Sequence, residues 1–203
     1  MFNLKSTSTL ILLTMMGFVS CRQSQDEGTS SKTLITPAES TAITSGTIDS
    51  SFVLLPGIAA GKIKINEDSE EVIKVLGRPD SSDAAMQKMV AFWFDKSDAV
   101  RYSTAIYAVR DTGDMPKARV RQIRITSPKF KTESGIGVTS TLNEVKKAYK
   151  VNKIPSLHTE NYEYYIWDSM DGIAFEVGTD SICTGIIIHK KGEALKATNL
   201  PLR

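Results

Sequence analysis

The folded part of this chain contains a sequence unit that occurs twice, and this repeat limits the architectures open to it. Segments 65–77 and 138–150 align with a constant offset of 73 residues. At the same offset, the aromatic residue Phe94 falls on Trp167, and an aspartate follows each of them. An offset shared by separated segments indicates that one structural unit has been duplicated.

Both repeated segments are predicted to form short helices that begin in the same way. Asp68 and Thr141 are good N-cap residues, and Glu71 and Glu144 stand three residues later, which is the spacing of a capping box. Apolar residues then recur at helical spacing. Because each helix is short, its apolar side must pack on another element.

Runs rich in aromatic and β-branched residues predict strands after each helix. We expect three strands in each copy, at 90–94, 101–109 and 119–126, and at 162–167, 173–177 and 184–189. The expected fold class is therefore α+β. It consists of two tandem units, each a short helical segment followed by an antiparallel meander, with the helices packed on one face of the sheet.

The amino terminus predicts where the protein is located. Lys5 precedes an apolar stretch at 10–19, which has the length of a secretory signal core and is too short to span a bilayer. The stretch leads into Ser20 and Cys21, an arrangement that resembles the bacterial lipoprotein signal. The resemblance implies that Cys21 is lipidated and becomes the first residue of the mature chain.

The composition after Cys21 predicts a tether followed by a folded module. The segment up to residue 51 is dominated by Ser, Thr, Gln, Glu and Asp and is typical of a disordered chain, whose reach over about 30 residues is about 30 Å. The expected organisation is a signal peptide at 1–20, a Ser/Thr-rich tether at 21–51, a first α+β repeat at 52–130 and a second at 131–203. The expected location is the cell envelope, at the outer membrane.

The chain has two cysteines, and the sequence allows two fates for them. If Cys21 is lipidated, Cys183 is a small buried residue in a strand. If an ordinary signal peptidase leaves Cys21 free, the two cysteines form a disulfide in an oxidising compartment. The intact mass of membrane-extracted protein distinguishes the two.

Charge and motifs favour a binding role over catalysis. The net charge is +2 and no block of Lys and Arg stands out, so nothing indicates a nucleic-acid partner. His158 and His189 lack zinc-type spacing, and no nucleophile elbow, P-loop or Cys-His signature occurs. The glycine pair at 135–137 is interpreted as a loop. We expect no enzyme activity, no metal site and no cofactor.

The aromatic strands provide the candidate binding surface. Alternation places one set of aromatic side chains under the helices, namely Phe92, Phe94, Tyr165 and Trp167. The opposite face then carries the candidate binding residues Trp93, Tyr162, Tyr164 and Arg124, together with Ile166 and Gln122. Exposed Trp, Tyr and Arg are typical of a protein- or glycan-binding surface. Alternatively, the tether, the other unit or a second copy of the chain covers this face.

These features together resemble a known repeat. A capped helix with a Glu-Val pair, the helix end Gly77-Arg78-Pro79 and a strand with two aromatics and an aspartate are similar to the repeat of the beta-lactamase-inhibitor-protein-like superfamily. That superfamily includes the one-unit outer-membrane assembly lipoproteins BamE/SmpA and two-unit inhibitor proteins. The resemblance covers roughly residues 55–190 and implies a fold, not an activity.

The expected function is that of a membrane-anchored lipoprotein of the cell envelope. It would act as a non-enzymatic protein-binding or scaffold module, held to the membrane by its lipid and bound to an envelope protein. The alternative is a tethered inhibitor or a small-ligand or glycan-binding protein, which an apolar cleft between the two units would favour. An envelope hydrolase would require a clustered triad or a metal site.

Overall fold

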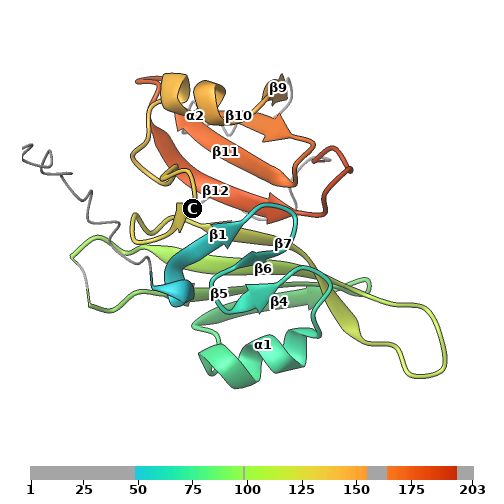
Figure 1. The fold of residues 1–203 in the computed structure, drawn as a ribbon. Helices are drawn as coiled ribbons and strands as arrows, with labels where there is room; N and C mark the ends of the chain where they lie inside the picture. The colour runs from blue at the N-terminus through green and yellow to red at the C-terminus, as the bar shows by residue number, and fades with distance from the viewer. Residues whose placement is uncertain (1–48, 98, 155–163, 196–203) are drawn as a thin grey trace, which may run out of the picture. The chain divides into compact units, whose positions relative to one another are not determined.

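Eight strands pair in one antiparallel sheet, and the pairing of β7 with β12 forms its middle (Figure 1). The computed structural model describes residues 49–97, 99–154 and 164–195. In spatial order the strands of this large sheet are β4 (Ser81–Ala85), β5 (Lys88–Phe94), β6 (Ser103–Arg110), β7 (Ala118–Ile125), β12 (Cys183–His189), β11 (Ile173–Gly178), β10 (Tyr164–Ser169) and β9 (Asn152–Ile154). Strands β4 to β7 belong to the first copy of the repeat and β9 to β12 to the second, so the two copies share one sheet.

A smaller four-stranded sheet is built from very short strands. Their order is β3 (Ile63–Lys64), β2 (Ala59–Ala60), β1 (Val53–Leu55) and β8 (Lys131–Thr132). Strand β1 follows a 3-10 turn at Ser50–Phe52 and pairs in parallel with β8. This pairing ties the start of the first copy to the start of the second.

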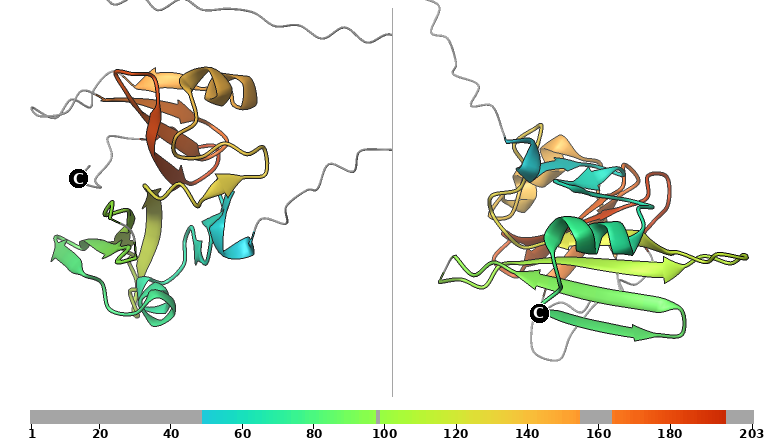
Figure 2. Two further views of the ribbon diagram at one scale, coloured as in Figure 1. Left: turned by 90° about the vertical axis from the view of Figure 1, so that its left-hand side faces the viewer. Right: turned by 90° about the horizontal axis from the view of Figure 1, so that it is seen from below.

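The two predicted helix starts are confirmed. Helix α1 (Ser69–Leu76) is capped by the side chain of Asp68, and α2 (Leu142–Ala148) begins with a complete capping box of Thr141 and Glu144. In the first copy Glu71 forms an ion pair within the helix instead of completing the box. Figure 2 shows that α1 lies along the strands of the first copy and α2 along those of the second.

The expected α+β class with helices as the main covering layer is wrong. Strands dominate the described residues, and the two helices have only eight and seven residues. Each helix buries one apolar side chain against the sheet, Val72 in α1 and Val145 in α2, which is too little to cover eight strands. The remaining cover comes from the small sheet, whose two- and three-residue strands are too short to give an alternation signal.

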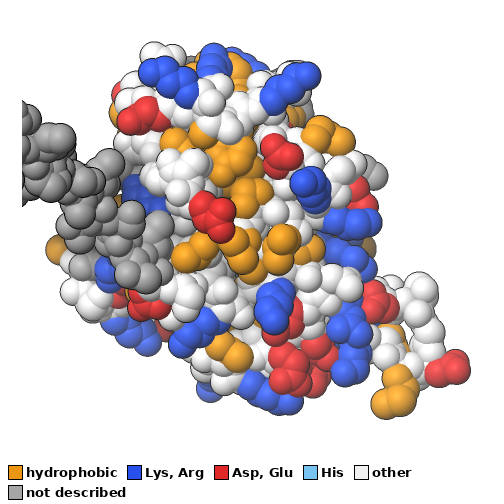
Figure 3. All heavy atoms as spheres, viewed as in Figure 1, with side chains coloured by type: hydrophobic (Ala, Val, Ile, Leu, Met, Phe, Trp, Pro, Cys, Tyr) orange, Lys and Arg blue, Asp and Glu red, His pale blue; other side chains and the backbone are white. Residues whose placement is uncertain are grey.

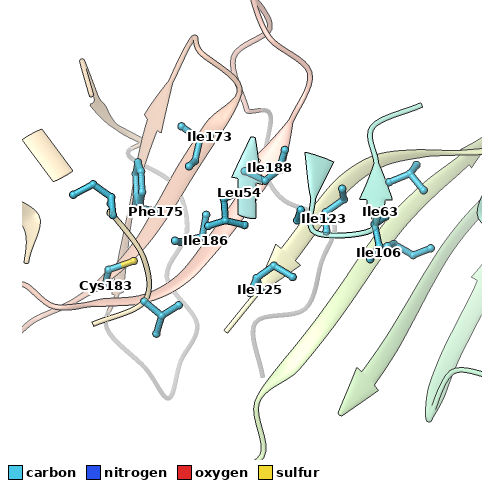
Figure 4. Packing of buried hydrophobic residues seen from close by; sticks show 14 of the residues in the cluster. Leu54, Ile63, Ile106, Ile123, Ile125, Ile173, Phe175, Cys183, Ile186 and Ile188 are labelled. Atoms are coloured by element: carbon cyan, nitrogen blue, oxygen red, sulfur yellow. The ribbon is translucent and has the colours of Figure 1, made fainter. Parts of the chain in front are cut away.

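One continuous core fills the space under the small sheet and the helices. We call this side of the large sheet the inner face; its buried side chains come from both copies and include Ile106, Ile123, Ile125, Phe175, Ile186 and Ile188. Figure 4 shows Leu54 and Ile63 of the small sheet packed among them. The β7–β12 pair is therefore part of the core and not a boundary between two separate cores.

The repeat is visible in the backbone at the offset that the sequence gives. Asn66 and Thr139, which are 73 residues apart, both have positive φ angles, 67° and 78°. Their N–H groups donate to Val120 of β7 and to Cys183 of β12, each at 2.8 Å. In each copy, a residue just before the helix is thus hydrogen-bonded in the same way to the beginning of the last strand.

The offset does not hold for the aromatic strands. Trp93 lies opposite Thr104, and Trp167 lies opposite Phe175. Thr104 in turn lies opposite Ile125, Phe175 lies opposite Ile186, and Ile125 and Ile186 lie opposite each other on the inner face. Trp93, not Phe94, therefore shares a face with Trp167. If the connection between helix and strand is one residue longer in one copy, every side chain of that strand points to the other face.

Several predicted features lie outside the described residues. These are the signal peptide, Cys21, nearly all of the tether, His158 and Tyr162. In the part of the chain that is described, no helix is long and apolar enough to cross a membrane. The second cysteine, Cys183, lies in β12 with 1% of its surface exposed, and burial raises the pKa of its thiol to about 12. The prediction of a small buried cysteine in a strand is confirmed.

Candidate functional site: the junction of the two copies and an exposed sheet edge

The structure does not bring the four candidate binding residues together on one exposed face. Trp93 lies on the inner face, packs against the core, and its indole N–H donates to the carbonyl of Gly77 at 2.9 Å. Arg124 and Tyr164 lie on the opposite side, which we call the outer face, and both are buried. Tyr162 is outside the described residues. The predicted exposed aromatic surface is therefore wrong for the three residues that can be placed.

The companion prediction, that four aromatic side chains share the core face, is half correct. Tyr165 and Trp167 are on the inner face, where Lys153 and Lys146 lie over their rings. Phe92 and Phe94 are on the outer face, stacked with their ring centroids 6.3 Å apart. The two aromatic strands are out of phase with each other, so one alternation rule cannot describe both.

A buried ion pair links the two copies on the outer face. The Nε and Nη2 atoms of Arg124, on β7, donate to the two carboxylate oxygens of Glu176, on β11, both at 2.7 Å. Gly185 of the intervening strand makes room for this bidentate pair, because a Cβ at that position would overlap the Glu176 carboxylate. The third guanidinium nitrogen, Nη1, is buried and has no hydrogen-bond partner among the described residues. Removing either charge would leave the other buried and uncompensated.

A second buried pair, His189 and Asp168, lies at the end of strand β12. His189 Nε2 lies 2.8 Å from Asp168 Oδ1, and His189 Nδ1 lies 3.2 Å from the carbonyl oxygen of Lys190. The other Asp168 oxygen accepts the N–H of Leu195 at 2.8 Å. Both ring nitrogens of His189 thus lie within hydrogen-bond distance of an oxygen atom.

This His-Asp pair does not build a hydrolytic triad. In a triad the second ring nitrogen faces a nucleophile, but His189 Nδ1 faces a backbone carbonyl. Within the described part of the chain, no group of three His, Cys, Asp or Glu side chains is placed to hold a metal ion. The pair instead fixes the segment after β12 against the sheet through Leu195.

A cleft of about 740 Å³ opens beside His189, where the two copies meet. Its walls come from the segment 57–66, from strands β6 and β7, and from the segment 189–195. The sequence did not predict this cleft, because its lining residues come from separate places in the chain. It is mixed in character, with Ile58, Ile65 and Leu195 beside charged and amide side chains.

The two edges of the large sheet differ. Strand β4 at one edge is exposed at all five residues, and its sequence, Ser-Ser-Asp-Ala-Ala, has no lysine, arginine or proline. Strand β9 at the other edge has only three residues and carries Lys153. Short length, lysine and proline are the usual protection of an edge against pairing with another strand. The edge at β4 lacks all three.

Comparison with known proteins gives no match. No protein-family model, no curated protein and no solved structure matches this chain.

Proposed function

We propose that this chain is a lipid-anchored, non-enzymatic module of the cell envelope that binds a partner protein through the edge strand β4. Cys21 carries the anchor, residues 21–51 form the tether, and the outer membrane is the location that the amino-terminal sequence favours. The partner is an envelope protein that supplies an extended segment. The resemblance to tandem beta-lactamase-inhibitor-protein-like repeats stays a prediction.

The observation that carries this proposal is the unprotected backbone of β4. The strand is joined to β5 by the two-residue turn Met86-Gln87, with φ angles of 50° and 65°, and Ala85 faces Lys88 as the closing pair. In such a hairpin the closing pair and every second pair exchange hydrogen bonds. Ser81, Asp83 and Ala85 are thus bonded to β5, while Ser82 and Ala84 direct their N–H and C=O groups away from the sheet. These groups support the addition of another strand.

The charge of β4 favours a different protein over a second copy of this chain. An antiparallel pairing of two β4 strands that uses Ser82 and Ala84 of both is centred on Asp83. It would place the two Asp83 carboxylates directly opposite each other, which destabilises a strand pair. A segment with a lysine or arginine opposite Asp83 avoids this repulsion. The small side chains of Ser82 and Ala84 leave room for large residues of the partner.

The proposal is tested with a proline substitution that spares the hairpin. Ala84→Pro removes an N–H that does not bond to β5, so the module should keep its melting temperature. Crosslinking of the anchored protein in its native envelope, followed by mass spectrometry, should recover the partner at least about tenfold less well from this variant. The matched control Ala84→Val keeps the N–H and should recover the partner as the unmodified chain does. Undiminished recovery with the folded proline variant would overturn the proposal.

A further inference from the structure

We infer that the cleft at the junction of the two copies binds a small molecule that carries an oxyanion, a carboxylate or a phosphate, on an apolar body. The cleft has about 740 Å³, which is within the usual range for small-ligand sites. It lies next to the β7–β12 pair, in the middle of the sheet, and uses none of the residues of β4. The inference is thus independent of the proposed protein partner.

Positive charge dominates the walls of this cleft. Lys64, Arg121 and Lys190 line it together with a single acidic residue, Glu193, which forms an ion pair with Lys190. The excess positive charge of the walls therefore comes from Lys64 and Arg121. In Figure 3, Lys and Arg side chains are spread over the visible face, and several of them lie at its right-hand side, where β12 ends in Figure 1. An anion is the ligand that such walls stabilise.

A second large cleft provides a contrast. It has about 660 Å³, lies beside α1, and is lined by three basic residues and by Asp68 and Glu70. Asp68 is already paired with Lys117 at 3.1 Å. Its charged lining residues sum to +1, against +2 for the junction cleft, so it favours an anion less strongly.

Two of the cations in the junction cleft differ in a way that suits recognition of an oxyanion. Arg121 is held from two sides, with Nη1 3.3 Å from Asn66 Oδ1 and Nη2 3.1 Å from Asp111 Oδ1, so its guanidinium is oriented before a ligand arrives. Lys64 forms no side-chain ion pair within the described part of the chain. An oriented arginine beside a free lysine is a common way to hold an oxyanion.

The remaining lining contains both polar and apolar side chains, and its exposed apolar part suits a ligand with an apolar body. Gln122 and His189 are buried polar side chains on the wall, with 8% and 4% of their surfaces exposed. Ile58 is 60% exposed at the same cleft. Covering this isoleucine with an apolar group removes its surface from water, which favours binding. A bare inorganic anion would leave it exposed and should bind more weakly.

The test uses the chain from residue 21 to 203 with Cys21→Ser, which prevents acylation, and titration calorimetry at low salt. The probes are n-octyl phosphate and octanoate below their micelle concentrations, 1-octanol as the neutral match, and inorganic phosphate as the headgroup alone. We expect the two anionic amphiphiles to bind at one site, about tenfold or more tightly than 1-octanol and inorganic phosphate. Their binding should weaken as salt is added.

Matched variants locate the site. Lys64→Gln should weaken n-octyl phosphate binding about fivefold or more, whereas Lys147→Gln, an exposed lysine on α2, should leave it unchanged. Ala84→Pro should also leave it unchanged, which separates this inference from the proposed protein-binding function. The inference would be overturned if 1-octanol bound as tightly as n-octyl phosphate, or if the two lysine variants had equal effects. Binding to phosphatidate vesicles alone, and not to the free probes, would also overturn it.

Discussion

The two copies of the repeat share a backbone plan but differ in what surrounds their strands. In the second copy, β11 and β12 are buried at nearly every position, and β11 includes the fully buried Phe175. In the first copy, β4 is exposed throughout and most of β5 is half-buried. The buried core takes side chains from both copies, so the first copy differs mainly in the exposed strands at its edge of the sheet.

The largest expected effect compares a buried strand of the second copy with a half-buried strand of the first. Phe175→Ala should destabilise the module by about 4 kcal/mol, because it opens a cavity where Phe175 meets Tyr149. Phe92→Ala, in the half-exposed β5, should cost only about 1 kcal/mol. Urea unfolding of both variants gives the comparison. Equal losses would show that β5 is packed as tightly as β11 and would contradict this difference.

The next effect tests the link between the copies. Glu176→Leu should cost about 3 kcal/mol, because it leaves the buried guanidinium of Arg124 without its carboxylate. Replacing both residues, with Arg124→Met and Glu176→Leu, should recover most of that loss, since no charge then remains buried. The free energy of unfolding in urea is the measurement. A double variant that is less stable than the single one would show that the ion pair has a role beyond balancing its own charges.

The smallest effect concerns acid stability at the surface of the first copy. Hydrogen bonds from the Ser97 side chain and backbone, and the neighbouring Lys129, lower the pKa of Asp95 from 3.8 to about 2. A carboxyl with a lowered folded-state pKa contributes stability above pH 4 and loses it as the pH falls towards 2. In the variant Asp95→Asn, the melting temperature should therefore fall less between pH 4 and pH 2 than in the unmodified chain. Wild-type and variant curves that keep the same slope there would contradict this assignment.

The local parts of the fold could be predicted from the sequence. The caps Asp68 and Thr141 mark the helix starts because capping depends on residues a few positions apart. The strand runs were found because β-branched and aromatic residues occur in them at high density. The buried Cys183 followed from its place in such a run.

The faces and the covering layer could not be predicted in the same way. Assigning Trp93 and Phe94 to faces requires the register of β5 against its neighbours, and a slip of one residue reverses the result. The strands at 53–64 are two or three residues long, so their apolar residues carry no period. The Arg124–Glu176 and Asp168–His189 pairs join residues 52 and 21 positions apart, a proximity that only the strand order creates.

The central claim, that β4 accepts a strand from a partner, is tested most directly by amide hydrogen exchange at Ser82 and Ala84. In the purified module these two outward N–H groups should exchange as fast as exposed loop amides, while the N–H of Asp83 is slowed by its pairing with β5. In the anchored protein within its native envelope, Ser82 and Ala84 should become at least about tenfold slower. If both amides stay fast while the crosslinked partner is bound, strand addition at β4 is contradicted.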